Sequence, residues 1–295
     1  MLLTLDKLQD LALAAGFDDC GAARAVRLDS DALLLEKWLK AQNNGSMQYM
    51  QQNFEKRVDP RVLVPGCKTV IVVLKNYFTG SWQETDAPYI AQSGLSKEDY
   101  HFVMKTKLYA LEEAITSYFG CEVFSSTHQH LFCDSAPVLE RRWAQRAGLG
   151  QIGKNKQFIH PCLGSFVHIG VLMMNIDMEQ YSEPSAEDIC VGCDLCVKAC
   201  PTGALRGEMF DARKCVSYLT IERKEPLEEK FKAVVKGSLY GCDTCARVCP
   251  YNKNILPTTD IELTADSRLL QMSKDDWDST SRRQRIKLLR RLAKE

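Results

Sequence analysis

The cysteines of this 295-residue chain constrain its fold more than any other feature of the sequence. Eight of the thirteen cysteines lie within residues 190–249. A chain of this length can bury a core without cross-links, and an odd number of cysteines crowded into one stretch argues against a disulfide framework. We therefore expect these cysteines to bind metal.

The first cysteine group has the spacing C-x2-C-x2-C-x3-C-P that bacterial ferredoxins use to bind 4Fe-4S clusters. The second group is one cysteine short, with Leu239 in the first position, and Cys215 is the remaining cysteine of the region. In two-cluster ferredoxins the last cysteine of such a run binds the other cluster. Cluster one is therefore predicted to take Cys190, Cys193, Cys196 and Cys249, and cluster two Cys200, Cys215, Cys242 and Cys245. Zinc in two four-cysteine sites is the alternative, although zinc ribbons usually present two C-x2-C pairs.

The remaining five cysteines lie in or beside apolar segments, so we expect small core residues rather than ligands. They are Cys20, Cys67, Cys121, Cys133 and Cys162. The start of the chain carries acids at Asp6 and Asp10 and no basic leader. No apolar run approaches the roughly 20 residues that span a bilayer. We expect a soluble, cytoplasmic protein without a membrane partner.

Hydrophobic periodicity predicts an α/β layer structure (α+β or α/β) for about the first 180 residues. Helical spacing covers residues 4–15, 31–42 and 100–119, and a further helix, 137–147, has a proline in its first turn and Gly148 just past its end. Short apolar or β-branched runs predict strands at residues 69–77, 122–126 and 166–175.

A polar stretch at residues 179–187 marks a boundary before the cysteines. We divide the chain into an α/β domain (1–180), a ferredoxin-like domain with two 4Fe-4S clusters (181–260) and an extension with a short C-terminal helix (261–295). Lys and Arg balance Asp and Glu at 38 each, but the last fourteen residues carry seven bases and one acid. This tail is either a docked helix with a solvated basic face or a surface for an anionic partner such as RNA.

Residues 133–142 (CDSAPVLERR) lead into a glycine-rich segment, residues 144–156. Asp134 or Ser135 could cap the helix that Pro137 begins. The glycines of G-x-G-x-x-G could hold a tight turn against a ligand or merely end the helix, because this run follows a helix rather than a strand. The residues alone leave both interpretations open.

Several motifs together closely resemble the epoxyqueuosine reductase family. They are KR-DPR at residues 56–61, DSAPVLER at 134–141, GLGQIGKN at 148–155, GSF at 164–166 and the two cysteine motifs. They follow the family's order and cover roughly residues 1–260. The resemblance implies a cobalamin-dependent oxidoreductase with two 4Fe-4S clusters that reduces the epoxide of epoxyqueuosine at the tRNA wobble position to queuosine. It places the cobalamin and the substrate in the first domain and implies a monomer served by an electron donor that the sequence does not identify.

The resemblance also assigns roles to single residues. Asp134 matches the family's proton donor, and the eight cysteines match its cluster ligands. The positions that match cobalamin contacts are Arg57, Asp134, Phe158, Ile159, His160, Ser165 and Ser217. The family holds the corrin without a histidine below the cobalt, so neither His101 nor His160 is expected to bind it. Partial desolvation of Asp134 would keep it protonated near neutral pH.

Longer family members continue into a helical-repeat segment, whereas this chain ends about 45 residues after Cys249. We expect residues 282–294 to replace part of that surface by contacting tRNA phosphates. Two other functions stay open. One is a reductive-dehalogenase-like cobalamin enzyme, although such enzymes usually carry a twin-arginine leader. The other is a two-cluster ferredoxin-type electron-transfer protein without a substrate.

Overall fold

The structure is a computed structural model that describes residues 2–83, 88–126, 128–184, 188–207, 209–281 and 284. The basic tail lies outside the described residues except for Gln284, and so does the helix predicted there. Among the described residues, no helix combines the length and the apolarity that crossing a bilayer requires.

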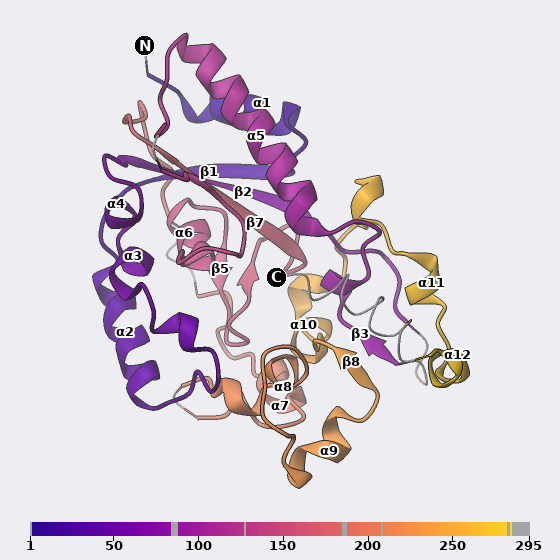
Figure 1. Ribbon diagram of the computed structural model, residues 1–295. Helices are drawn as coiled ribbons and strands as arrows, with labels where there is room; N and C mark the ends of the chain where they lie inside the picture. Colours follow the sequence, from indigo (N-terminus) through magenta and orange to yellow (C-terminus); the bar gives the residue numbers. More distant parts are fainter. Residues whose placement is uncertain are drawn as a thin grey trace.

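A four-stranded antiparallel sheet is the centre of the upper half of the molecule (Figure 1). Its order is β1 (Asp19–Arg24), β2 (Thr69–Asn76), β7 (Val167–Met174) and β4 (Leu131–Phe132). Every residue of β2 is buried, because helices cover both faces of the sheet and the run of Val, Ile and Leu supplies apolar side chains to each. The strands predicted at residues 69–77 and 166–175 are confirmed.

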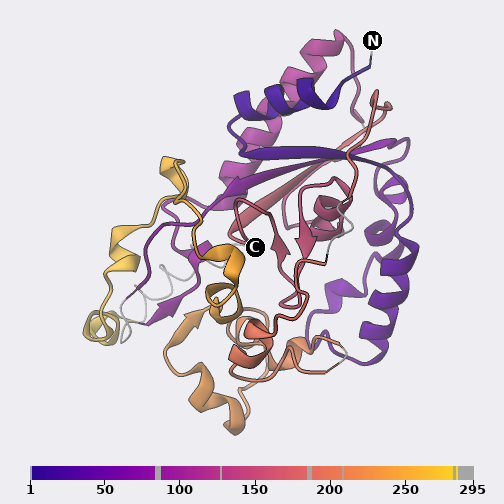
Figure 2. The ribbon, with the colours of Figure 1, turned by 180° about the vertical axis from the view of Figure 1, so that it is seen from behind.

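The two faces of the sheet have separate cores. Helices α1 (Leu5–Ala14) and α5 (Tyr100–Phe119) cover one face, where Ile71 belongs to the buried cluster. Helix α6 (Glu140–Arg146) covers the other, where Val72 does. Neighbouring residues of β2 therefore serve opposite cores, as the alternation of side chains along a strand requires. Figures 1 and 2 show α1 and α5 lying together above the sheet.

The predicted helix at residues 100–119 is confirmed at both ends. The carboxylate of Asp99 accepts a hydrogen bond from the backbone N–H of His101 at 2.9 Å and so caps the first turn. Gly120 ends the helix in the left-handed conformation, with φ of 67°. The helices predicted at residues 4–15 and 31–42 are confirmed within two residues, as α1 and as α2 (Asp29–Lys40).

The strand predicted at residues 122–126 is wrong. This segment is irregular, and its Val123 carbonyl accepts one backbone hydrogen bond, from Asn175 at 2.8 Å. The strand that pairs with β7 here is the later two-residue β4. The sequence prediction missed β1, because its Gly and Ala residues lack the β-branched pattern and its pairing with β2 stabilises it instead.

The helix predicted from Pro137 begins three residues later, at Glu140. The N–H groups of Ser135 and Val138 donate to carbonyls two residues earlier, so the chain before the helix forms tight turns. Leu139 precedes the helix without a side-chain cap. Neither Asp134 nor Ser135 therefore caps α6, and the capping interpretation is wrong.

The cysteine-rich region lies below the sheet (Figure 1). The segment between β2 and α5 contacts this region through strand β3 (Tyr89–Ile90). Strand β3 pairs in parallel with β8 (Ser238–Tyr240). The indole Nε1 of Trp38 donates to the carbonyl of Phe210 at 2.7 Å. Residues of α2 and of the segment between β2 and α5 thus pack with the cysteine-rich region. The three-part division of the chain stays a prediction. The other elements are α3 (Phe54–Val58), α4 (Pro60–Leu63), β5 (Gln151–Ile152), β6 (Phe158–Ile159), α7 (Leu195–Ala199), α8 (Val216–Ile221), α9 (Glu229–Val235), α10 (Thr244–Arg247), α11 (Ser267–Leu270), α12 (Lys274–Ser279) and the 3-10 turns Gln48–Met50, Gln92–Gly94, Ala212–Lys214, Pro250–Asn252 and Ile261–Leu263.

Of the five cysteines predicted to be core residues, three are buried and two are not. Cys20, Cys67 and Cys133 are buried as predicted. Cys121 and Cys162 are exposed, so that prediction is wrong for them. Cys121 follows Gly120 beyond the end of α5, and Cys162 lies in the turn after β6, where apolar neighbours in sequence do not ensure burial.

We predict that Gly21→Ala destabilises the protein. A Cβ at this position of β1 would lie 2.1 Å from the backbone oxygen of Ala147 at the end of α6, so sheet and helix would have to move apart. Overpacking of this kind costs about 3 kcal/mol of unfolding free energy. Urea denaturation measures this loss of unfolding free energy. Gly120→Ala is the control, since a Cβ at Gly120 would meet nothing within 4 Å. In the control, only the backbone strain of a left-handed residue remains, at about 1 kcal/mol. A Gly21→Ala midpoint equal to the wild type would contradict the prediction.

Candidate active site

Helices α7 and α10 pack against each other and bring the two cysteine motifs together. Cys196 lies in α7 and Cys245 in α10, while Cys200 and Cys249 follow them, each before a proline. Cys215 immediately precedes α8. All eight cysteines of the motifs are buried or half-buried.

Four thiols form a first neighbourhood. Burial raises the pKa of Cys249, and the nearby Cys190 and Cys193 raise it further. Burial also raises the pKa of Cys196, followed by the effects of Cys190 and Cys249. Thiols act on each other's ionisation in this way at short range. The structure therefore brings together the four cysteines that the ferredoxin rule groups as cluster one.

The other four thiols form a second neighbourhood beside the first. Burial, then Cys242 and Cys215, raise the pKa of Cys245 to about 12. Burial raises the pKa of Cys215, to which Cys242 and Cys200 add. The pKa of Cys245 also responds to Cys196 of the first group. The two groups are thus adjacent, as electron transfer between two clusters requires.

Backbone N–H groups point at several of these sulfurs. Burial acts to raise the pKa of Cys200, but hydrogen bonds from the N–H groups of Leu205, Thr202 and Ala204 outweigh it, and the pKa lies below its ordinary value. The N–H of Lys154 donates to Cys190 Sγ at 3.4 Å. Hydrogen bonds to sulfur favour the thiolate and are one means by which proteins set cluster potentials.

The glycine-rich segment packs on the first cysteine group. A Cβ on Gly153 would lie 2.6 Å from Ile159 Cδ1 and 3.5 Å from Cys190 Sγ. The ammonium of Lys154 donates to the Cys193 carbonyl and pairs with Asp194, both at 2.9 Å. The segment thus fits closely against the loop that carries three of the cysteines.

The zinc alternative demands a tighter arrangement of donors. A tetrahedral zinc site draws four ligands to about 2.3 Å or less from one ion. Within the part of the chain that the structure describes, no three His, Cys, Asp or Glu side chains converge closely enough to hold a single ion. The thiols of a cubane stand further apart, because four iron atoms lie between them. The preference for clusters therefore comes from the C-x2-C-x2-C-x3-C-P spacing of the sequence.

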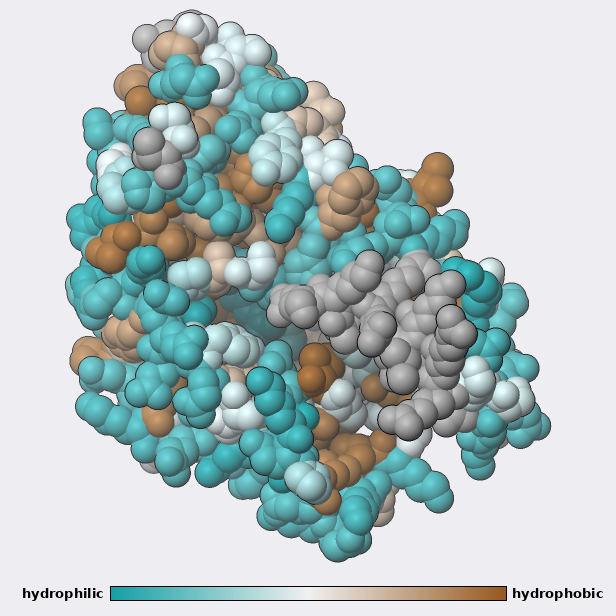
Figure 3. Space-filling model, viewed as in Figure 1, coloured by the Kyte–Doolittle hydropathy of each residue, from teal (hydrophilic) through white to brown (hydrophobic). Residues whose placement is uncertain are grey.

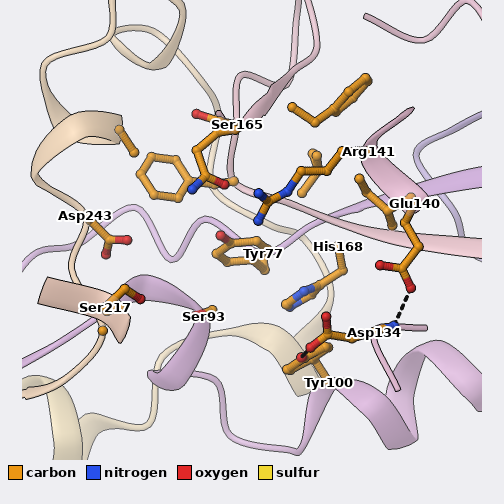
Figure 4. A pocket seen from close by; sticks show the side chains of 18 of the residues that line it. Tyr77, Ser93, Tyr100, Asp134, Glu140, Arg141, Ser165, His168, Ser217 and Asp243 are labelled. Carbon is orange, nitrogen blue, oxygen red and sulfur yellow. Dashed lines mark hydrogen bonds between the residues drawn. The ribbon is translucent and has the colours of Figure 1, made fainter. Parts of the chain in front are cut away.

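A cavity opens between the sheet above and the cysteine motifs below. Its volume is about 1070 Å³ when the space at its open mouth is included. Asp134 lines one side, and Cys242 and Cys245 line the other. Figure 3 shows the hollow in a largely hydrophilic face, and Figure 4 shows polar side chains from both sides pointing into it. A ligand in this cavity would lie between a carboxylate and the second group of thiols.

The residues that the family resemblance assigns to cobalamin divide into two groups. Those that line the cavity are Asp134, Phe158, Ser165 and Ser217. Those that do not are Arg57, Ile159 and His160. The cofactor roles of all seven stay predictions.

The three residues outside the cavity wall are engaged within the protein. Arg57 is 7% exposed, and its Nη2 donates to the Tyr49 carbonyl at 2.9 Å. Burial lowers its pKa, and among the described residues its buried Nε has no hydrogen-bond partner. His160 lies 2.9 Å from Asp19 through Nε2 and accepts two backbone N–H groups at Nδ1. Ile159 is buried beside Gly153.

Asp134 is held in an unusual backbone conformation, with φ of 60°. Its Oδ2 accepts a hydrogen bond from the Tyr100 hydroxyl at 2.6 Å and lies 3.8 Å from His101 Nε2. Its backbone N–H donates to Glu140 Oε1 at 2.5 Å (Figure 4). The left-handed conformation costs about 1–3 kcal/mol in a residue with a side chain, so these contacts offset a strain. They turn the carboxylate into the cavity.

The ionisation of Asp134 differs from the expectation that burial keeps it protonated. The interaction with His101, and then that with Tyr100, lower the pKa of Asp134 to about 2 despite desolvation. The raised pKa belongs to Glu140, where burial and then the charge of Asp134 bring it to about 8. Two carboxyl groups with opposite shifts share the site. At neutral pH, Asp134 is the ionised one of the two.

An aromatic stack forms the wall beside Asp134. His168 of β7 lies between the rings of Tyr100 and Tyr77, with centroids 4.1 and 4.2 Å away. His168 is 7% exposed, and its buried Nε2 has no hydrogen-bond partner in the part of the chain that the structure describes. Burial lowers its pKa to about 3, so the ring is neutral. Sequence reasoning missed Tyr100, Glu140 and His168 as site residues; a histidine within the apolar run of β7 was the one available signal.

Hydrogen bonds between Ser165 and Asn252 connect the cavity wall to the cysteine motifs. The side-chain amide of Asn252, three residues past Cys249, accepts the Ser165 N–H at 2.8 Å and donates to Ser165 Oγ at 2.7 Å. Gly164 permits this approach, since a Cβ there would lie 2.1 Å from Asn252 Oδ1. Ser165 is therefore positioned by the residues around a cysteine.

Comparison with known proteins identifies both halves of this site. Residues 57–135 match the family described as "Epoxyqueuosine reductase QueG, DUF1730", and residues 189–252 match a "4Fe-4S double cluster binding domain". An epoxyqueuosine reductase of Cyclobacterium marinum is 38% identical over 92% of this chain and 88% of its own length. One of Cellulophaga algicola is 38% identical over 93% and 89%. A crystal structure of epoxyqueuosine reductase with an epoxyqueuosine-modified tRNA-Tyr stem loop has a TM-score of 0.80 at 28% identity, covering 96% of this chain and 74% of that one.

We predict that Glu140→Gln removes a pH dependence of stability. Glu140 has an ordinary pKa of 4.5 and a pKa of about 8 in the folded protein, so its favourable contribution is complete below pH 4.5 and is lost as the pH rises through about 8. The wild type should lose a few kcal/mol of unfolding free energy relative to the variant across this range, at about 1.4 kcal/mol per pKa unit. Denaturant titrations at several pH values measure this difference. The exposed Glu113→Gln is the control, and a flat difference for Glu140→Gln would contradict the prediction.

Proposed function

Because the chain belongs to the epoxyqueuosine reductase family, and is thus an oxidoreductase, we propose that it reduces the epoxide of epoxyqueuosine at the wobble position of tRNA to give queuosine. One observation carries the proposal. The cavity has a carboxylate, Asp134, on one side and two cysteines of the double-cluster domain, Cys242 and Cys245, on the other. Such a site can supply electrons from one side of a ligand and a proton from the other.

Two 4Fe-4S clusters are the proposed electron carriers. We assign Cys190, Cys193, Cys196 and Cys249 to the first cluster and Cys200, Cys215, Cys242 and Cys245 to the second. The mutual effects of these thiols on their pKa values support the grouping. The second cluster would border the cavity, since Cys242 and Cys245 line it. Electrons would then enter through the first cluster.

Cobalamin is the proposed second cofactor, and the chemistry of the cavity lining suits it. A corrinoid presents a broad ring with polar side chains, and the cavity pairs the aromatic wall of Phe158 and Tyr77 with the hydroxyls of Ser165 and Ser217. The buried, unpartnered Nε2 of His168 is a further hydrogen-bonding group of that wall. Ser165, Ser217 and Phe158 would hold the cofactor, and Arg57, Ile159 and His160 would support its surroundings from behind the wall. Cobalamin held by these residues would supply the electron pair for opening the epoxide.

Asp134 is the proposed proton donor. An epoxide oxygen that leaves carbon gains negative charge and needs a proton, which a positioned carboxylic acid can deliver. Tyr100 fixes the side chain of Asp134 through its hydroxyl, and Glu140 fixes its main chain. The carboxyl group is therefore preorganised in one orientation that faces the cavity.

The substrate is proposed to be a tRNA anticodon loop. The related reductase has been solved with an epoxyqueuosine-modified tRNA-Tyr stem loop, and its fold matches nearly the whole of this chain. The open mouth of the cavity suits a base that leaves a single-stranded loop to react. We propose in addition that residues 282–294 contact tRNA phosphates, that a separate redox protein supplies electrons, and that the protein acts as a monomer.

Anaerobic reconstitution with iron, sulfide and cobalamin tests this function. We expect about eight iron atoms per chain, a bound corrinoid visible in the absorption spectrum, and conversion of epoxyqueuosine to queuosine in a modified tRNA stem loop under a chemical reductant. Mass spectrometry of the released nucleosides measures the product. Clusters without cobalamin binding would favour the ferredoxin-type alternative, and turnover of a haloaromatic compound but not of the tRNA would favour the dehalogenase-like one.

We predict that Asp134→Asn loses turnover while it keeps both cofactors. Asparagine still accepts a hydrogen bond from Tyr100 but has no acidic proton, and loss of a general acid costs about 10²- to 10⁴-fold in rate. Product formation is measured by mass spectrometry, and iron and cobalamin by absorbance. The exposed Asp10→Asn of α1 serves as control. Turnover within a factor of two of the wild type would remove Asp134 from this role.

A further inference from the structure

The proposed proton donor must be reloaded after each turnover. Its surroundings favour the ionised form, because His101 and Tyr100 hold the pKa of Asp134 at about 2. At neutral pH such a carboxyl is protonated about once in 10⁵ molecules. Another group close to its oxygens must therefore hold the proton at rest and transfer it when needed.

His101 has the geometry of such a group. Its Nδ1 lies 2.9 Å from Asp99 Oδ1, and its Nε2 lies 3.8 Å from Asp134 Oδ2. The imidazole thus stands between two carboxylates, one at each ring nitrogen. Its side chain is 21% exposed, so water reaches the ring at atoms other than Nε2, which is buried on the side of Asp134. The interaction with Asp134 is the first cause, and that with Asp99 a further one, of a pKa above the ordinary histidine value.

The other groups around His101 are less suited to this task. Tyr100 stacks on His101 at 4.0 Å and has a raised pKa, so it keeps its proton near neutral pH. His168, from β7, stacks on the other face of Tyr100 and is neutral, with its pKa lowered to about 3. Glu140 can hold a proton, but its oxygen contacts the main-chain N–H of Asp134, away from the carboxylate, as Figure 4 shows.

We propose that His101, oriented by Asp99, is the positioning residue that takes protons from solvent and passes them to Asp134. The inference rests on the proposed function. In the transfer, the Nε2–H bond of the imidazolium breaks and an O–H bond forms on Asp134, leaving neutral imidazole and a carboxylic acid. Asp134 then gives that proton to the epoxide oxygen as a C–O bond breaks, with two electrons coming from the reductant of the proposed reaction. A second proton delivered by the same route lets the oxygen leave as water, so that epoxyqueuosine, two electrons and two protons give queuosine and water. Neutral His101 regains a proton from water, and the Asp99–His101–Asp134 row returns to its resting charge.

Titration of the histidines tests the resting state without any turnover. The chain has five histidines, so a sample labelled on the histidine rings gives few NMR signals, and the one missing in His101→Gln identifies His101. In the reconstituted protein we expect the His101 midpoint above the ordinary value of about 6.5. It should fall by about one pH unit or more in Asp134→Asn and in Asp99→Asn, since each loses a facing carboxylate. A wild-type midpoint at or below 6.5, unmoved by either variant, overturns the proposal.

Turnover of the modified stem loop tests the transfer itself. We expect His101→Gln to lower kcat about tenfold or more at pH 8, less at pH 6, with an unchanged KM, because a solution acid must replace the missing donor. Added imidazole should restore part of the rate in His101→Gln but not in Asp134→Asn. His130→Gln is a matched control, since it removes another histidine–carboxylate pair (Nε2 to Glu112, 2.8 Å) outside the cavity wall.

The outcomes distinguish a failure of the proposed function from a failure of the proton transfer by His101. A wild type that forms no queuosine contradicts the proposed function. An active wild type whose His101→Gln variant keeps its rate at every pH contradicts the relay alone. A rate loss in His101→Gln that imidazole does not restore, with an unchanged pH profile, also contradicts it, because a merely structural role would give that result. His101→Asn is the second variant if His101→Gln does not fold.

Discussion

The contact between β3 and β8 fixes how far the sheet lies from the cysteine motifs, and the cavity depends on it. Around this parallel pair, Asp243 accepts hydrogen bonds at 2.7 Å from the Tyr89 hydroxyl and from the Gln92 N–H. Burial raises the pKa of Asp243, so these hydrogen bonds satisfy a carboxyl group with little access to water. A residue between Cys242 and Cys245 is thus tied to the segment that leads into α5. These contacts connect the carboxylate side of the cavity with its thiol side.

Within this frame, the surroundings of two carboxyl groups determine their different ionisation. Asp134 has an imidazole and a phenol as neighbours, which favour its charge, whereas Glu140 is desolvated beside a negative neighbour. Pairs of titratable groups whose pKa values are pushed apart are typical of acid–base sites. The opposite assignment, with a desolvated Asp134, follows from considering one residue alone. The structure shows that its neighbours outweigh burial.

Much of the fold could be predicted from local pattern, whereas the site could be predicted only where residues lie close in sequence. The buried strand β2 and the capped helix α5 have strong periodic signals, and the cysteine spacing predicted a domain that binds two 4Fe-4S clusters. Strand β1 has no such signal because its small residues depend on β2. Tyr100 donates a hydrogen bond to Asp134, although the two residues are 34 positions apart in the chain. His168, from strand β7, stacks on Tyr100. No spacing rule places these three together, because the sheet and α5 determine their distance.

The amide of Asn252 has a wider consequence. It holds Ser165 in the cavity wall and follows Cys249 by three residues, so the shape of the ligand chamber depends on a loop that the metal would keep in place. Iron–sulfur centres are sensitive to air, and their loss would release this loop. If the cavity binds a corrinoid as proposed, oxidative loss of the proposed clusters would loosen the corrinoid site as well as stop the electron supply, so that one exposure to oxygen would act at two separate points.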